Sequence, residues 1–153
     1  MDSTALPSTT PSISYHTYTA GKNANCVSTR DFRSLLQHCA LGERRPIDDI
    51  ACLDGMILNS NLIVSAWHTT EGSRKLIGIA RAVTDFHYAC YLSDLAVDNA
   101  FQNQGIGKRL MQRLTQAVAS TCKIILIAAP AANDYYAPLG FEHNERCWVL
   151  NLD

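Results

Sequence analysis

Four stretches of the chain are expected to be strands: residues 13–19, 61–69, 75–83 and 87–97. Residues 13–19 and 91–97 alternate with a period of two, as partly buried strands do. Residues 70–73, Thr-Glu-Gly-Ser, are typical of a hairpin loop between the second and third stretches. The last three stretches are therefore expected to be consecutive antiparallel strands.

Three other segments show helical spacing, in which apolar residues recur every three or four positions. Ser28 or Thr29 can cap the first, which is expected to reach roughly Ala40. The second begins near Pro46, a residue that suits the first turn of a helix. The third opens at residue 105, and its apolar side holds Leu110, Met111, Leu114 and Val118.

The end of the chain completes an expected α/β (α+β) fold. Residues 123–128, Lys-Ile-Ile-Leu-Ile-Ala, are apolar and β-branched, which predicts a buried strand parallel to residues 87–97. Strand, helix and strand would then form a right-handed crossover. A short helix over residues 131–138 and a last strand over residues 147–150 would follow. The pattern predicts a mixed, mostly antiparallel sheet flanked by helices on both faces.

Composition and charge narrow the class of protein. A length of 153 residues suits a single domain, residues 13–153, after a loose tail at residues 1–12. A net charge of −1 gives no electrostatic footprint for nucleic acid or an anionic membrane. The tail lacks the basic start and apolar block of a signal peptide, so the cytoplasm is the expected location. The six cysteines include no Cys-x-x-Cys pair, and no metal site is expected.

The most specific chemistry lies in residues 91–114, where a strand is followed by a polar turn and a helix. Gly105-Ile106-Gly107 stands where the helix begins. A helix N-terminus presents unpaired N–H groups and a positive dipole end, and two glycines let a ligand approach them. The junction is therefore expected to hold a phosphate or pyrophosphate. It is neither a P-loop nor a dinucleotide fingerprint, whose further glycine positions are Gln102 and Leu110 here.

The junction resembles the pyrophosphate loop of the GCN5-related N-acetyltransferase (GNAT) family, Arg/Gln-x-x-Gly-x-Gly/Ala. The matching residues are Gln102, Asn103, Gln104, Gly105, Ile106 and Gly107, with Leu95-Ala96-Val97 at the expected distance upstream. A second block, residues 135–141, resembles the family's aromatic-Tyr-x-x-x-Gly-Phe segment. The resemblance implies a GNAT-like acyl-CoA N-acyltransferase fold, in which the sheet is splayed at its central pair of parallel strands.

The resemblance also implies acetyl-coenzyme A (acetyl-CoA) as cosubstrate and no metal. The pantetheine arm would pair with the backbone of Leu95, Ala96 and Val97 like an added strand. The pyrophosphate would take N–H groups from residues 104–108, which end at Lys108. Asn133 would reach the pantetheine or the nucleotide side. Tyr136 matches the family's general acid, which protonates the departing thiolate, and Tyr135 is expected in the core.

The general base is not evident, because the positions where relatives carry Glu or His are Tyr91 and Ser93 here. The resulting hypothesis is a water held by Tyr91 and Ser93 that relays the proton outward; an acceptor that arrives as a neutral amine would need no base. Asp94 would lie on the opposite face of the strand unless a β-bulge shifts the alternation. His87 shares the parity of Tyr91 but lies near the strand start, and Cys90 would face away from the splay.

The predicted function is direct transfer of an acetyl group from acetyl-CoA to a primary amine, with a small molecule favoured over a protein as acceptor. Two alternatives stay open: a non-catalytic acyl-CoA-binding regulatory module, and an acetyltransferase for protein lysines or N-termini. Residues 32–58 would form one wall of the acceptor pocket, and no motif in them identifies the acceptor. A homodimer is also left open, with residues 123–150 able to supply an interface strand.

Overall fold

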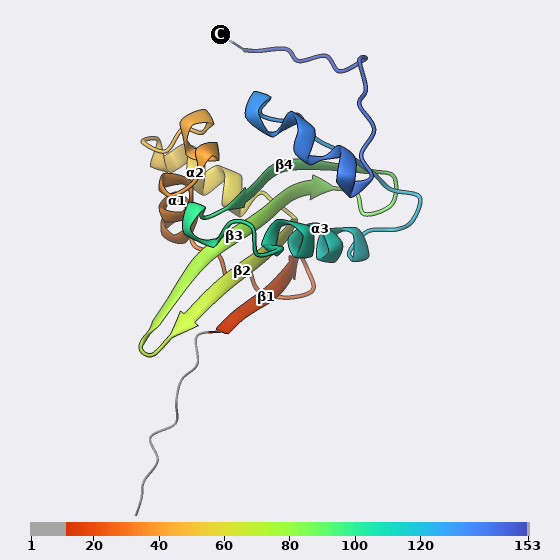
Figure 1. Cartoon of the computed structure of the whole chain (residues 1–153). Coiled ribbons are helices and arrows are strands. Elements are labelled where there is room, and N and C mark those ends of the chain that lie inside the picture. The colour runs from red at the N-terminus through yellow and green to blue at the C-terminus, as the bar shows by residue number, and fades with distance from the viewer. Residues whose placement is uncertain (1–11, 153) are drawn as a thin grey trace, which may run out of the picture.

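The centre of the fold is one five-stranded sheet with the strand order β1-β2-β3-β4-β5 (Figure 1). The computed structural model describes residues 12–152. The first four strands pair antiparallel, and β5 pairs parallel to β4. The strands are β1 (Ser12–Thr19), β2 (Leu62–Thr70), β3 (Ser73–Thr84), β4 (Ala89–Val97) and β5 (Lys123–Ile125). The predicted mixed, mostly antiparallel sheet is confirmed.

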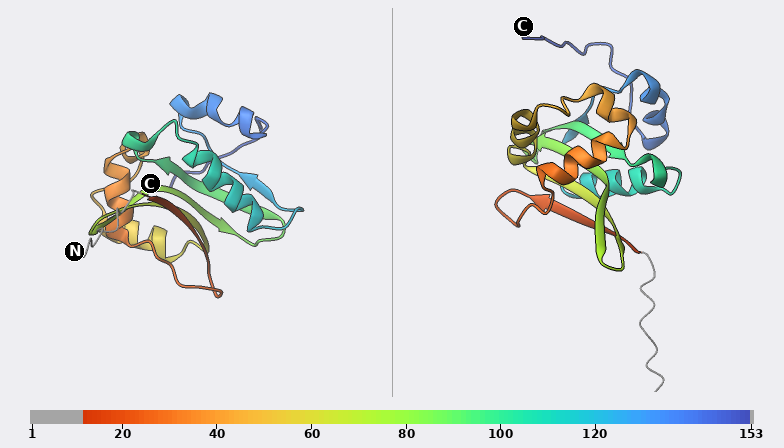
Figure 2. Two further views of the ribbon diagram at one scale, coloured as in Figure 1. Left: turned by 60° about the horizontal axis from the view of Figure 1, so that its bottom comes forward. Right: turned by 90° about the vertical axis from the view of Figure 1, so that its left-hand side faces the viewer.

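Helices cover both faces of the sheet (Figure 2). One face carries α3 (Ile106–Gln116), and the other carries α1 (Thr29–Gln37) and α2 (Ile50–Leu58). The alternation of side chains along β2 explains this division, because successive residues point to opposite faces. Leu62, Val64 and Ala66 pack with α3, whereas Ile63 and Trp67 pack with α1 and α2.

A glycine in β3 sets how closely α3 approaches the sheet. A Cβ at Gly78 would lie 3.1 Å from methyl carbons of both Ile106 and Leu110. Ile106, Leu110 and Leu114 are buried against the strands. The N-terminus of α3 is therefore held in a fixed position by a packed core rather than by its loop alone.

A β-bulge interrupts the pairing of β3 with β4. Arg81 of β3 pairs with Asp94, whereas the next residue, Ala82, pairs with Leu92. Ser93 is left as the extra residue of β4. A bulge of this kind reverses the face that each later residue of the strand occupies.

The reversal places Asp94 on the face of α1 and α2. Cys90 and Leu92 pack with α3, whereas Ala96, also even-numbered, packs with α1 and α2. Simple alternation would place Asp94 opposite Tyr91, but the β-bulge, the exception stated for this expectation, shifts the alternation at Ser93. Both side chains belong to the α1/α2 face.

β4 and β5 separate after three paired residues, which are Ala89 with Lys123, Cys90 with Ile124 and Tyr91 with Ile125. β5 ends at Ile125, earlier than the predicted residue 128. Within residues 12–152 no strand pairs with this edge of β4 beyond Tyr91. The sheet therefore opens into a wedge at its parallel pair, as predicted.

The last part of the chain differs from the prediction. The short helix expected over residues 131–138 consists of two 3-10 turns, η3 (Pro130–Tyr135) and η4 (Ala137–Leu139). The strand expected over residues 147–150 is not formed, and this segment runs clear of the sheet (Figure 1). Trp148 is 93% exposed. An apolar sequence forms a strand only beside a pairing partner, and the described residues give this one none.

The expected N-terminal tail of residues 1–12 falls mostly outside the structure. β1 already includes Ser12, and the rest of the expected tail, residues 1–11, lies outside the described residues. No helix in residues 12–152 is both long and apolar enough to cross a membrane.

Candidate active site

The loop before α3 leaves the N-terminus of this helix exposed. Gly105 caps the helix in the left-handed conformation, with a φ of 77°, and a Cβ there would meet open space. The N–H group of Arg109 donates to the Gly105 carbonyl. The N–H groups of the three residues between them therefore have no partner within the helix. Such a terminus can bind an anion.

Gly107 has a second role that the sequence does not reveal. A Cβ at this position would overlap the hydroxyl oxygen of Tyr135. Tyr135 is 44% exposed, so the expectation that it packs in the core is wrong. Because Gly107 has no side chain, the Tyr135 hydroxyl can lie against the first turn of α3.

Tyr136 lies between η3 and η4 and is half-buried. Its ring meets those of Tyr135 and Phe141 edge-on, with centroid distances of 5.3 and 5.5 Å. Burial, and to a smaller extent Tyr135, raises the pKa of Tyr136 above its ordinary value of 10.0. The phenol is therefore protonated at neutral pH and able to donate a proton. Asn133, in η3, is exposed.

The β-bulge brings Asp94 into a buried cluster with Arg45 and Arg81. Arg45 Nε donates to Asp94 Oδ1 over 2.6 Å, and Arg81 Nε donates to Asp94 Oδ2. The Asp94 side chain is fully buried. Each of its oxygens accepts from a guanidinium and neither is open to a substrate. Asp94 therefore lies on the right face for a base but is not available as one.

Ser93 and Tyr91 lie where β4 separates from β5. Arg81 Nη2 donates to Ser93 Oγ, and Arg45 Nη2 donates to the Ser93 carbonyl oxygen, each over 2.8 Å. Tyr91 is exposed and Ser93 half-buried. Both candidate relay residues are thus accessible, and the Ser93 hydroxyl is hydrogen-bonded to the Arg81 guanidinium.

Sequence reasoning missed Arg45 and Arg81. Arg81 stands between Ala80 and Ala82 in a buried stretch of β3. A charged side chain at such a position needs a partner, and this is the signal that could have found the cluster. Arg45 carries no comparable signal, because it follows the 3-10 turn η1 (Ala40–Arg44) in a polar connection.

Two other candidates lie outside the wedge. His87 is exposed in the turn before β4, where its backbone N–H group donates to Asp85 Oδ1. Cys90 is fully buried, and desolvation raises the pKa of its thiol, which disfavours the reactive thiolate. Among residues 12–152 no three His, Cys, Asp or Glu side chains are grouped so that they could hold a metal ion.

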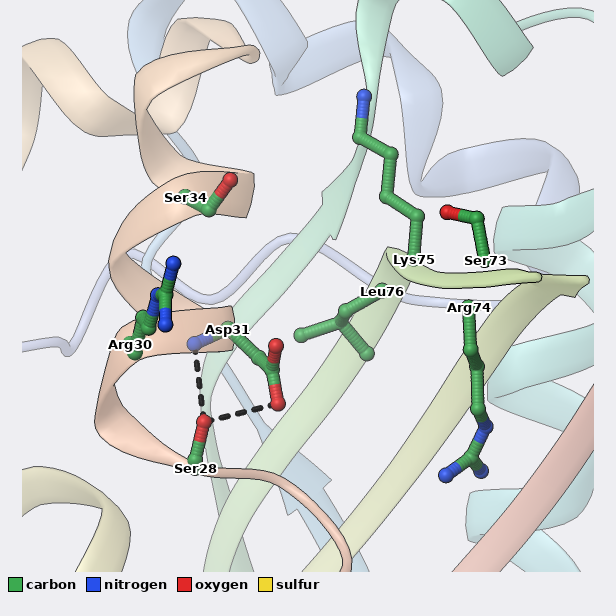
Figure 3. Close-up of a pocket in the computed structure, with 8 residues that line it drawn as sticks. All are labelled: Ser28, Arg30, Asp31, Ser34, Ser73, Arg74, Lys75 and Leu76. Atoms are coloured by element: carbon green, nitrogen blue, oxygen red, sulfur yellow. Dashed lines mark hydrogen bonds between the residues drawn. The ribbon is translucent and has the colours of Figure 1, made fainter.

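Two hollows of the surface lie elsewhere. One, of about 420 Å³, adjoins Phe86 and His87. The other, of about 550 Å³, opens between the start of α1 and the hairpin end of β3 (Figure 3). Its lining is mostly polar and consists of Ser28, Arg30, Asp31, Ser34, Ser73, Arg74, Lys75 and Leu76. Neither hollow includes a residue of β4 or of the loop before α3, so the candidate site is defined by the wedge and not by these hollows.

Comparisons with known proteins agree on one family. The model of the acetyltransferase (GNAT) domain matches residues 60–143, more than half of the chain. GCN5-related N-acetyltransferase 1, chloroplastic, of Arabidopsis thaliana is 36% identical over 77 residues, which cover 49% of this chain and 39% of that protein. A histone acetyltransferase of Glycine max is 32% identical over 109 residues, which cover 65% of this chain and 46% of that protein. The chain thus spans less than half the length of either relative.

A solved structure supports the fold over almost the whole chain. Aminoglycoside N-acetyltransferase AAC(6')-Iy in complex with CoA superposes with a TM-score of 0.63 and covers 97% of this chain and 99% of its own. At 18% identity this likeness concerns the fold alone. Together with the family model and the relatives, it shows that the chain belongs to the GNAT acetyltransferase family.

Proposed function

We propose that the protein is an acetyl-CoA-dependent N-acetyltransferase that moves the acetyl group directly to a primary amine of a small molecule. The observation that carries this proposal is the open edge of β4, which begins after Tyr91 and leads toward the N-terminus of α3. An extended arm can pair along this edge while its phosphates reach the free N–H groups of the helix.

The cosubstrate would be held mainly by backbone groups. The pantetheine arm pairs with Leu95, Ala96 and Val97, the last residues of the open edge. The pyrophosphate takes N–H groups of the loop, Lys108 adds positive charge, and Asn133 contacts the pantetheine or the nucleotide side. The loop residues in this role are Gln102, Asn103, Gln104, Gly105, Ile106 and Gly107.

The chemistry needs a proton donor, which we assign to Tyr136. The amine nitrogen attacks the thioester carbonyl carbon, the C–S bond breaks, and the thiolate takes the proton of Tyr136. The position of Tyr136 supports this role, because it matches the family's general acid and its phenol is protonated at neutral pH. The nitrogen becomes positively charged when it attacks, and it passes its proton to a water held by Tyr91 and Ser93, and from there to solvent, which leaves the neutral amide. Tyr136 then regains a proton from solvent.

Two proteins of the same family bear on the class of acceptor. A cationic small molecule agrees with the aminoglycoside N-acetyltransferase of the same fold. The relative named a histone acetyltransferase supports a protein lysine as the competing acceptor. A non-catalytic acyl-CoA-binding module is the third alternative, and it gives no reason for a tyrosine at the family's acid position.

Location and assembly stay predictions. We keep the cytoplasm as the expected compartment, and the relative named chloroplastic makes the plastid the competing one. Imaging of the whole protein fused to a fluorescent reporter distinguishes the two. The homodimer is tested by sedimentation of the purified protein.

The function is tested by thiol release from acetyl-CoA with polyamines, aminoglycosides, arylalkylamines, amino acids and lysine peptides as acceptors. Tyr136→Phe removes the proton donor and should lower kcat on the best acceptor by roughly 100-fold, within the range of general acid catalysis. Tyr135→Phe removes the neighbouring hydroxyl and should leave kcat within about twofold, since no step uses that proton. CoA binding without turnover on any acceptor would favour the non-catalytic module, and equal loss in both variants would contradict the role of Tyr136.

A further inference from the structure

The hydroxyls of Ser60 and Ser93 both accept a hydrogen bond from the Arg81 guanidinium, but they differ in the hydrogen bond that they donate. Arg81 Nη1 donates to Ser60 Oγ over 3.0 Å, and Arg81 Nη2 donates to Ser93 Oγ over 2.8 Å. Ser60 in turn donates its proton to the Met56 carbonyl over 2.6 Å. Among the described residues, Ser93 Oγ has no hydrogen bond other than the one it accepts from Arg81.

This contact determines how Ser93 can act. A hydroxyl has one proton to donate and two lone pairs that accept. One lone pair of Ser93 is taken by Arg81, so its proton is directed away from the guanidinium. Hydrogen bonds that involve an ionised group are shorter and stronger than neutral ones, and a bond that a hydroxyl accepts polarises it as a donor. Ser93 is therefore prepared to give a strong hydrogen bond.

The guanidinium of Arg81 cannot easily turn away from Ser93. Its Nε donates to Asp94, and its Nη1 also reaches the Met56 carbonyl over 3.3 Å. Its side chain is only 6% exposed. Five donors in a rigid planar fork fix the direction of each hydrogen bond once the others are made. The cluster thus sets the orientation of the Ser93 hydroxyl.

Ser93 also lies where a thioester would react. It is the extra residue of the β-bulge, two residues beyond Tyr91, where β4 and β5 stop pairing. The cluster beside it contains two guanidinium groups and one carboxylate, an excess of one positive charge. Preformed donors and positive charge stabilise an oxyanion as it develops during acyl transfer.

We propose that the Ser93 hydroxyl is the hydrogen-bond donor to the acetyl carbonyl oxygen and that Arg81 is the residue that positions it. This inference rests on the proposed function and refines the water relay. The second lone pair of Ser93 still accepts a hydrogen bond from the water, while the Ser93 O–H donates a hydrogen bond to the carbonyl oxygen. No proton is transferred from Ser93, which keeps its O–H bond throughout the reaction.

The test compares single and double variants by thiol release from acetyl-CoA. Ser93→Ala should lower kcat by roughly 100-fold, as loss of an oxyanion donor does, with the KM for acetyl-CoA nearly unchanged. Ser93→Thr, which keeps a hydroxyl, should recover most of the rate. Ser60→Ala removes the other hydroxyl that accepts from Arg81. It should leave kcat within about twofold, because the Ser60 hydroxyl donates its hydrogen bond to the Met56 carbonyl and not to the substrate.

A double-variant cycle separates positioning from structure. If Arg81 acts through the Ser93 hydroxyl, Arg81→Lys lowers kcat in the wild-type background but has little further effect in Ser93→Ala. Equal effects in both backgrounds, or an unchanged kcat in Ser93→Ala, would overturn the proposal. If Arg81→Lys does not fold, the comparison of Ser93→Ala, Ser93→Thr and Ser60→Ala decides. Turnover by the wild type tests the proposed function separately, and its absence with every acceptor would remove both.

Discussion

Replacing Asp94 with Asn should destabilise the fold far more than any surface charge would. The Asp94 side chain is fully buried, and its two oxygens accept from Arg45 and Arg81. The Arg81 side chain is 6% exposed, so Asp94→Asn leaves a guanidinium buried without its counter-ion. Removing one partner of a buried ion pair costs about 3–5 kcal/mol. This is a large share of the 5–15 kcal/mol by which domains of this kind are usually stable.

The loss is measured by urea unfolding followed by circular dichroism. With a slope of about 2 kcal/mol per molar urea, a loss of about 4 kcal/mol lowers the midpoint by about 2 M. Arg45→Gln should cost less than Asp94→Asn, because Asp94 keeps Arg81 and the Arg45 side chain is 21% exposed. Asp48→Asn is the matched control, since Asp48 is 93% exposed and lies 3.7 Å from Arg33, an arrangement worth at most about 1 kcal/mol.

The outcome that would refute this reasoning is an Asp94→Asn midpoint close to that of Asp48→Asn. It would mean that water or a shift of the backbone compensates Arg81, and that the cluster does not hold the bulge. A large loss in Asp94→Asn with a small one in Asp48→Asn supports the cluster as the element that fixes Ser93.

Two further predictions follow from backbone conformation and from charge. Gly105→Ala and Gly72→Ala both place an alanine in the left-handed region, at φ values of 77° and 73°, with open space around the new Cβ. Each should cost about 1–2 kcal/mol in urea unfolding, but only Gly105→Ala should weaken CoA binding in calorimetry, and equal binding by the two would contradict the loop assignment. The N–H groups of Tyr88, Ala89 and His87 lower the pKa of Asp85 to about 2. Because the folded pKa lies below the ordinary 3.8, this stabilisation is present above that value and is lost as the pH falls toward 2, so the unfolding midpoints of wild type and Asp85→Asn should converge on acidification.

Periodicity was sufficient to predict most of the sheet and the loop before α3. The alternation in β2 correctly divides Leu62, Val64 and Ala66 from Ile63 and Trp67. The glycine-opened start of α3 is local chemistry, since a left-handed cap and free N–H groups depend on a few adjacent residues. Features of this kind can be predicted from the sequence because they depend on adjacent residues and not on partners far along the chain.

The bulge was considered only as an exception for Asp94, although the sequence carries a signal for it. Apolar side chains of β4 occupy even positions at Cys90 and Leu92 and odd positions at Leu95 and Val97. This change of phase falls at Ser93 and marks an inserted residue, which an assumption of strict alternation hides. The identity of the partners of Asp94 could not be derived, because Arg45 lies 49 positions away in the chain.

The errors at the end of the chain have a different cause. Residues 147–150 have strand propensity, but propensity reflects packing against neighbours more than an intrinsic preference of the backbone. β5 has only three residues and ends at Ile125. Tyr135 was expected in the core, whereas it is exposed and its hydroxyl lies in the space that a side chain at residue 107 would fill.

The most direct measurement of the central claim is the set of backbone amide NMR shifts that change when isotope-labelled protein is titrated with CoA. If the cosubstrate binds in the wedge, the largest changes should fall on Leu95, Ala96 and Val97 and on residues 104–108, and they should saturate together. Saturating changes that cluster instead at Ser28 and Leu76, in the hollow beside α1, would contradict the assignment of the site, as would no saturable change at all.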